Sequence, residues 1–149
     1  MIVADSSYIV EGILRDASLF ENEVIIAPDL ALYEIINTLW KHQVLIRDLE
    51  NSSAHIKLLL ELVSTKTIQL VRPDEKLIND TYRLSVKRKA PVYDTVFVAL
   101  ALQLGLGLKS FDERQVDMLL EEEKSGKLGP PNRYSTEPRT SEDFRNKTS

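Results

Sequence analysis

Four acidic residues stand at positions where a carboxylate would serve chemistry. They are separated by 29, 60 and 18 residues, and they are Asp5, Glu34, Asp94 and Asp112. Carboxylates that converge on one crevice repel each other unless they are protonated or neutralised by a cation. If the fold brings the four together, they predict a site for a divalent cation with oxygen ligands. Such ligands favour Mg²⁺ or Mn²⁺ over zinc.

The composition agrees with oxygen ligands, because the chain has no cysteine and only two histidines, His42 and His55. It excludes a thiolate zinc site, a histidine-rich metal site, a disulfide framework and a cysteine nucleophile. The 149 residues are 43% hydrophobic, which suffices for one globular domain with a continuous core. The apolar run at 96–102 is far shorter than the roughly 20 residues of a membrane span. We therefore expect a cytoplasmic protein without a membrane partner.

The net charge of −4 argues mildly against a protein that binds nucleic acid by bulk charge alone. The four candidate ligands themselves contribute four negative charges, so the rest of the chain is neutral overall. Two bound divalent cations would cancel the four carboxylates. The charge balance is thus compatible with a nucleic-acid substrate once cations are present.

Short apolar runs alternate with longer stretches of helical period, which predicts parallel strands joined by crossover helices. Strands are expected at 1–5, 23–27, 68–71 and 106–111, and helices after Ser7, at 29–47, 52–63, 74–89 and 92–104, and from Asp112 onward. The predicted fold is a three-layer α/β/α sandwich around a mainly parallel sheet of four to five strands. Residues 1–125 would form this domain. Residues 126–149 hold three of the six prolines and two of the five glycines, and we expect a flexible tail there.

The predicted elements give each acid a defined place. Asp5 and Asp112 end the first and fourth strands, and parallel sheets bind ligands at the carboxyl ends of their strands. Asp94 lies in the first turn of an otherwise apolar helix, where an unpartnered carboxylate is costly. Its alternative role is a favourable charge at a helix N-terminus, worth about 0.3 to 1 kcal/mol. Glu34 shares a helix face with Asn37, although alone it would also suit a solvated position.

Four segments, taken in this order, resemble the PIN-domain ribonucleases and, among them, the VapC-type toxins of toxin–antitoxin pairs. They are IVADSS with Asp5 and Ser7, ALYEIINTLW with Glu34 and Asn37, APVYDTVFVALALQLG with Asp94, and LKSFDER with Ser110 and Asp112. The resemblance covers roughly residues 1 to 125 and leaves the tail unmatched. Ser110 stands where threonine is common in the family. The proline-rich stretch at 129–131 makes the family's frequent fifth strand unexpected here.

The resemblance implies a metal-dependent endoribonuclease that leaves 5′-phosphate and 3′-hydroxyl ends. One or two Mg²⁺ or Mn²⁺ ions would be held by the acidic quartet, with Ser7, Asn37 and Ser110 in support. The resemblance also implies an antitoxin partner and a homodimer. For the dimer interface, the apolar faces of the helices at 52–63 or 92–104 are the natural candidates.

A basic run precedes the helix that carries Asp94. It consists of Arg83, Lys87, Arg88 and Lys89. These cations would steer RNA phosphates toward the acids, or they would simply favour the dipole at the C-terminus of their own helix. The sequence leaves both roles open.

Two other functions compete with the nuclease. A degenerate PIN domain would bind RNA or a protein without cutting, and metal-dependent cleavage of RNA would discriminate against it. A response-regulator receiver would also be a small α/β protein with an acidic magnesium pocket. A receiver needs adjacent acids after the first strand and an aspartate after the third, but serines follow Asp5 and the third strand ends at Arg72 and Pro73.

Overall fold

The computed structural model describes residues 1–126, so the predicted tail beyond Gly126 lies outside the described residues. Four strands form one sheet in the order β3-β2-β1-β4, and every pair is parallel. The strands are β1 (Ile2–Ala4), β2 (Ile25–Pro28), β3 (Ile68–Val71) and β4 (Leu108–Lys109). The predicted parallel sheet is confirmed. Within residues 1–126 it has no fifth strand.

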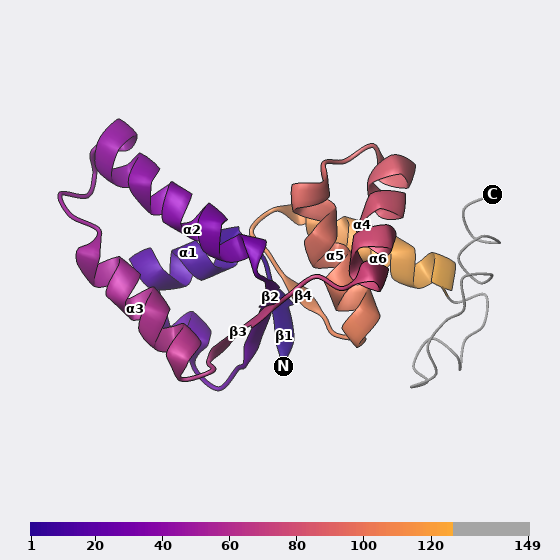
Figure 1. Cartoon of the computed structure of the whole chain (residues 1–149), viewed down its shortest axis with the longest axis horizontal. Helices are drawn as coiled ribbons and strands as arrows, with labels where there is room; N and C mark the ends of the chain where they lie inside the picture. Colours follow the sequence, from indigo (N-terminus) through magenta and orange to yellow (C-terminus); the bar gives the residue numbers. More distant parts are fainter. Residues whose placement is uncertain (127–149) are drawn as a thin grey trace.

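The helices lie in two layers on opposite sides of the sheet (Figure 1). One layer contains α1 (Ser6–Leu14), α2 (Leu30–Trp40) and α3 (Ser53–Ser64). The other contains α4 (Glu75–Arg88), α5 (Val92–Leu104) and α6 (Glu113–Gly126). The predicted three-layer α/β/α sandwich, of the kind that a PIN-like domain implies, is therefore confirmed. None of the helices in residues 1–126 is long and apolar enough to cross a membrane.

Helix α5 is the central helix of its layer. Every residue from 95 to 101 is buried, as its apolar sequence predicts. The helix packs on β1 and β2 and lies between α4 and α6. Because the middle of α5 is fixed from several sides, its first turn, which carries Asp94, is held firmly over the sheet.

Several element boundaries differ from the sequence prediction, most of them by one or two residues, and three of the differences have a local reason. The sequence predicts that β2 ends at Ala27, before Pro28. In the structure Pro28 is the last residue of β2, because proline is tolerated at a strand end. The helix expected at 29–47 ends as α2 at Trp40 and continues as a wider π turn over Lys41–Ile46. Strand β4 is shorter than expected, because Ser110 and Phe111 leave the sheet to bond with side chains at the start of α1.

Candidate active site

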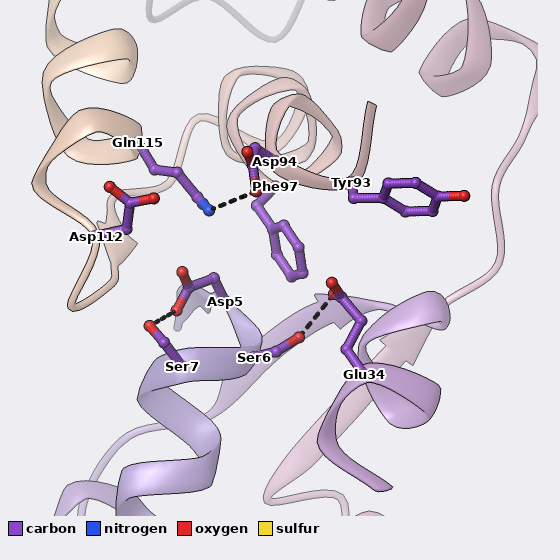
Figure 2. A pocket seen from close by; sticks show the side chains of 9 residues that line it. All are labelled: Asp5, Ser6, Ser7, Glu34, Tyr93, Asp94, Phe97, Asp112 and Gln115. Carbon is purple, nitrogen blue, oxygen red and sulfur yellow. Dashed lines mark hydrogen bonds between the residues drawn. The ribbon is translucent and has the colours of Figure 1, made fainter. Parts of the chain in front are cut away.

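A pocket of about 220 Å³ opens where the carboxyl ends of β1 and β4 meet the first turns of α1, α5 and α6 (Figure 2). Its lining residues are Asp5, Ser6, Ser7, Glu34, Tyr93, Asp94, Phe97, Asp112 and Gln115. All four acids of the predicted quartet are among them. Four separate elements therefore deliver one carboxylate each to a common pocket, as the order of the elements predicts.

Asp5 is the best-fixed carboxylate of the pocket. It is 3% exposed, and its Oδ1 accepts bonds from the Ser7 hydroxyl at 2.6 Å and the Tyr8 N–H at 3.1 Å. Its Oδ2 accepts a bond from the Ser110 hydroxyl at 2.5 Å. The bond from Tyr8 makes Asp5 the N-cap of α1, so one side chain both starts the helix and faces the pocket.

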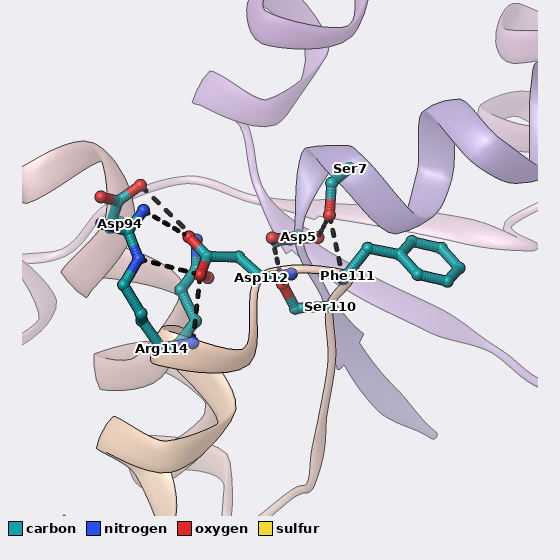
Figure 3. Close-up of polar contacts among 8 residues, drawn as sticks. Asp5, Ser7, Asp94, Ser110, Phe111, Asp112 and Arg114 are labelled. Atoms are coloured by element: carbon teal, nitrogen blue, oxygen red, sulfur yellow. Dashed lines mark hydrogen bonds and ion pairs between the residues drawn. The ribbon is translucent and has the colours of Figure 1, made fainter.

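The two predicted supporting serines connect the loop after β4 to α1 (Figure 3). Ser7 accepts the N–H of Phe111 at 3.1 Å, and Ser110 accepts the N–H of Asp112 at 2.8 Å. Each hydroxyl thus donates to Asp5 and accepts from the loop. Ser110 does not line the pocket, but it orients the carboxylate that does.

Glu34 reaches the pocket from α2, half-buried. Its Oε1 accepts a bond from the Ser6 hydroxyl at 2.8 Å. Burial raises the pKa of Glu34 above its ordinary value, and the bond from Ser6 opposes that rise. The negative charges of Asp94 and Asp5 raise the pKa further. These carboxylates are therefore close enough to repel one another.

Asp94 lies in the first turn of α5 and is also half-buried. Burial raises its pKa, the charges of Asp112 and Asp5 add to the rise, and the cation of Arg114 opposes it. Its Oδ1 has a long contact of 3.5 Å with the Gln115 amide nitrogen. A cation in the pocket would relieve the cost that this environment imposes on the charged form.

Asp112 differs from the others because it has a cationic partner. Its Oδ1 accepts from the backbone N–H and the Nε of Arg114 at 3.0 and 3.1 Å, and its Oδ2 accepts from Nη2 at 3.1 Å. These bonds lower the pKa of Asp112. The Arg114 side chain is 86% exposed, so it can leave the carboxylate at little packing cost.

The donor set fits a hard divalent cation in chemistry, because carboxylate oxygens, with no thiolate or imidazole, face the pocket. No three acidic or histidine side chains in residues 1–126 form a ready-made metal site. Three of the acids already have partners in the pocket wall: Asp5 bonds with serines, Glu34 with Ser6 and Asp112 with Arg114. Rotation of the Arg114 side chain away from Asp112 would free Oδ2, while Oδ1 would keep its bond from the Arg114 backbone N–H.

Other predicted residues lie away from the pocket. Asn37 is exposed on α2 and does not line it. In the basic run, Lys87 forms an ion pair with Glu122 at 3.0 Å, and Arg88 pairs with both Glu122, at 2.7 Å, and Glu121. These pairs join α4 to α6. The remaining members of the run, Arg83 and Lys89, do not line the pocket either.

Four lining residues were not predicted: Ser6, Tyr93, Phe97 and Gln115. Ser6 and Tyr93 each neighbour a quartet acid in sequence. Phe97 and Gln115 lie three residues after Asp94 and Asp112, one helical turn away. That spacing could have identified them, since a side chain one turn from a site residue shares its helix face.

No family model matches the chain. The curated protein Ribonuclease VapC3 of Pyrobaculum aerophilum is 35% identical to it over 88 residues. The match covers 58% of this chain and 64% of the relative, so the chain spans less than two thirds of that relative's length. This similarity confirms the resemblance to VapC-type PIN ribonucleases, and its 88 matched residues are fewer than the 113 that the four sequence segments span from residue 2 to residue 114.

Proposed function

We propose that this protein is a divalent-metal-dependent endoribonuclease and the toxin of a VapBC-type toxin–antitoxin pair. The observation that carries the proposal is the single pocket shared by Asp5, Glu34, Asp94 and Asp112. The similarity to a ribonuclease VapC supports the choice of RNA as substrate. We expect the protein to act in the cytoplasm, where such a substrate is found.

The quartet would hold one or two Mg²⁺ or Mn²⁺ ions. Such an ion lowers the pKa of water and stabilises negative charge on a phosphodiester. The protein's own task is to hold the acids in place: Ser7 and Ser110 fix Asp5, and Ser6 fixes Glu34. No side chain of the pocket has to act as a covalent nucleophile.

Two exposed side chains at the pocket are suited to contact RNA. Tyr93 lines the pocket with 62% of its surface exposed, so its ring offers a stacking face for a base. The exposed Arg114 can exchange the Asp112 carboxylate for a phosphate oxygen. This exchange would free Oδ2 of Asp112 for a cation when RNA binds.

Cleavage of a mixed RNA pool tests the proposal. With millimolar MgCl₂ the purified protein should produce fragments that accept a 5′ label only after phosphatase treatment. A chelator should stop the reaction and added MnCl₂ should restore it. If RNA is bound but stays intact with both metals, the proposal is wrong and the binding-module alternative is favoured.

We further propose an antitoxin partner and a homodimer, and we assign each a different surface. An apolar patch runs along α2 and the π turn, on a face of α2 other than the one that carries Glu34. It consists of Ile36, Trp40, Val44, Leu45 and Ile46, which are between 38% and 60% exposed. Because it is continuous with the helix that carries Glu34, we assign it to an antitoxin segment that reaches the pocket.

The dimer surface that we propose is on α4. Ile78, Tyr82 and Val86 are 57%, 66% and 63% exposed, and their spacing of four residues places them in one stripe. A single stripe of this kind can pair with itself across a twofold axis. Of the faces expected at 52–63 and 92–104, the one on α3 exposes one large apolar side chain, Leu60. The one on α5 is buried in its middle and exposes apolar side chains such as Val92 and Leu104 only near its ends.

A further inference from the structure

Gln115 is a buried polar side chain in the wall of the acidic pocket. It lies in the first turn of α6, three residues after Asp112, and is 5% exposed. Figure 2 shows its amide extending toward Asp94 and the centre of the pocket. Since an amide has two donors and an acceptor, a buried glutamine needs several partners.

Residues 1–126 do not supply those partners. Within the described part of the chain, the amide nitrogen has only the 3.5 Å contact with Asp94, which is at the long limit of a hydrogen bond. The amide oxygen Oε1 is buried and has no hydrogen-bond partner among the described residues. A buried acceptor without a donor destabilises the folded state. Its presence therefore points to a donor that enters the pocket from outside the chain.

The position itself does not call for a polar residue. Leu119 lies one turn further on the same face of α6 and is buried in the core. An apolar side chain at position 115 would continue that face without an unsatisfied amide. The glutamine is thus better explained by what the pocket receives than by how α6 packs.

The surrounding charges define the missing donor. The Tyr93 ring lines the pocket but points away from the acids in Figure 2. The other polar groups of the pocket wall are carboxylates, which are acceptors when ionised, and the hydroxyls of Ser6 and Ser7, which already donate to Glu34 and Asp5. A cation is drawn to the carboxylates, and Mg²⁺ or Mn²⁺ brings water molecules whose hydrogens need acceptors. On the basis of the proposed function, we propose that Gln115 is a positioning residue. Its amide nitrogen orients Asp94, and its Oε1 accepts a hydrogen bond from a water molecule of the hydrated cation.

Manganese affinity and the stability of the metal-free protein together test this role. Gln115→Met keeps the length of the side chain and removes both polar atoms. The metal-free variant should unfold at the same temperature as the wild type or higher, while its affinity for Mn²⁺, measured by electron paramagnetic resonance, should fall about tenfold. Gln115→Glu restores an acceptor oxygen and should bind Mn²⁺ more tightly than Gln115→Met, although its metal-free form should be less stable than the wild type.

Gln103→Met is the matched control. Gln103 is exposed on α5 and has the same long 3.5 Å contact with a carboxylate, that of Asp74, outside the pocket. Its substitution should leave Mn²⁺ affinity unchanged. The inference is overturned if Gln115→Met lowers metal-free stability and binds Mn²⁺ as the wild type does. If the wild type nevertheless binds Mn²⁺ and cleaves RNA, the proposed function stands and only the role of Gln115 is wrong. If the wild type does neither, both proposals are wrong.

Discussion

The charge state of the acids is set by their immediate neighbours. Burial reduces the solvation of Glu34 and Asp94, and neighbouring carboxylates repel their negative charge, so the pKa of each is raised. The bonds from Arg114 lower the pKa of Asp112. Without a cation, the two raised acids make the charged pocket costly to fold. A carboxylate that destabilises the metal-free fold yet binds a cofactor is typical of a functional site.

Replacement of Asp94 by asparagine tests this trade-off. Because the substitution removes a repelled charge and keeps the shape of the side chain, metal-free Asp94→Asn should unfold at the wild-type temperature or above it. The rise in Tm caused by millimolar MgCl₂ should be lost. Thermal melts followed by circular dichroism measure both. The exposed Asp117→Asn on α6 is the control and should keep the full Mg²⁺ effect. A normal Mg²⁺ effect in Asp94→Asn would exclude Asp94 as a ligand.

Tyr93 carries a separate prediction about the substrate. If its exposed ring stacks on a base, Tyr93→Ala should raise the KM for RNA about tenfold, in keeping with the energy of one base–aromatic stack. Tyr93→Phe keeps the ring and should retain the wild-type KM. Steady-state cleavage of a short RNA measures both. Equal KM values for the wild type and the alanine variant would show that RNA does not use this ring.

At the scale of the elements, the pocket exists because separate elements end together. β1 and β4 are adjacent parallel strands, so Asp5 and Asp112 follow them at the same edge of the sheet. Helices α2 and α5 then bring Glu34 and Asp94 from the two helical layers. The repulsion between these two acids is therefore a property of how the layers meet.

This arrangement predicts how pH changes the effect of a metal. An acid with a raised folded-state pKa stabilises the fold below its unfolded pKa, and this contribution is lost as the pH rises through the folded pKa. For Glu34 and Asp94 the loss begins just above their ordinary values of 4.5 and 3.8. The Mg²⁺-induced rise in Tm should therefore be larger at about pH 7.5 than at about pH 5. Melts with and without MgCl₂ at both pH values measure it, and a larger effect at the lower pH would contradict the account.

Much of this arrangement could be predicted from the sequence, because it depends on periodicity and on strand ends. The four strands, the buried α5 and the places of Asp5 and Asp112 follow from local patterns. The partners of individual side chains do not. The pairing of Arg88 with Glu122, 34 residues away, depends on how α4 packs on α6, and the burial of Gln115 depends on how α6 packs on the pocket.

The same limit applies at the start of α1. Both Ser6 and Ser7 follow Asp5, and the resemblance singles out Ser7 alone. In the structure Ser7 donates to Asp5, while Ser6 donates to Glu34, which is 28 residues away. Which acid each hydroxyl serves depends on the rotation of α1 relative to α2, and no local pattern encodes that rotation.

At the scale of the whole molecule, the exposed apolar stripe on α4 predicts a second copy of the chain. Val86→Asp places a charge at one end of the proposed contact stripe and should convert the dimer to a monomer at micromolar concentration, with the fold intact because Val86 is 63% exposed. Light scattering measures the mass, and circular dichroism checks the fold. Leu120→Asp, at an exposed apolar position on α6, is the control and should remain dimeric. A monomeric wild type would refute the proposed dimer.

The central claim is that the acidic pocket cleaves RNA with the help of a divalent cation. Its most direct test is endonucleolytic cleavage of one labelled RNA by the wild type, Asp94→Asn and Asp117→Asn, each with and without MgCl₂. The account predicts Mg²⁺-dependent cleavage by the wild type and Asp117→Asn, and a loss of at least about a hundredfold in Asp94→Asn. Cleavage by Asp94→Asn at the wild-type rate, or cleavage by the wild type that persists in a chelator, would contradict it.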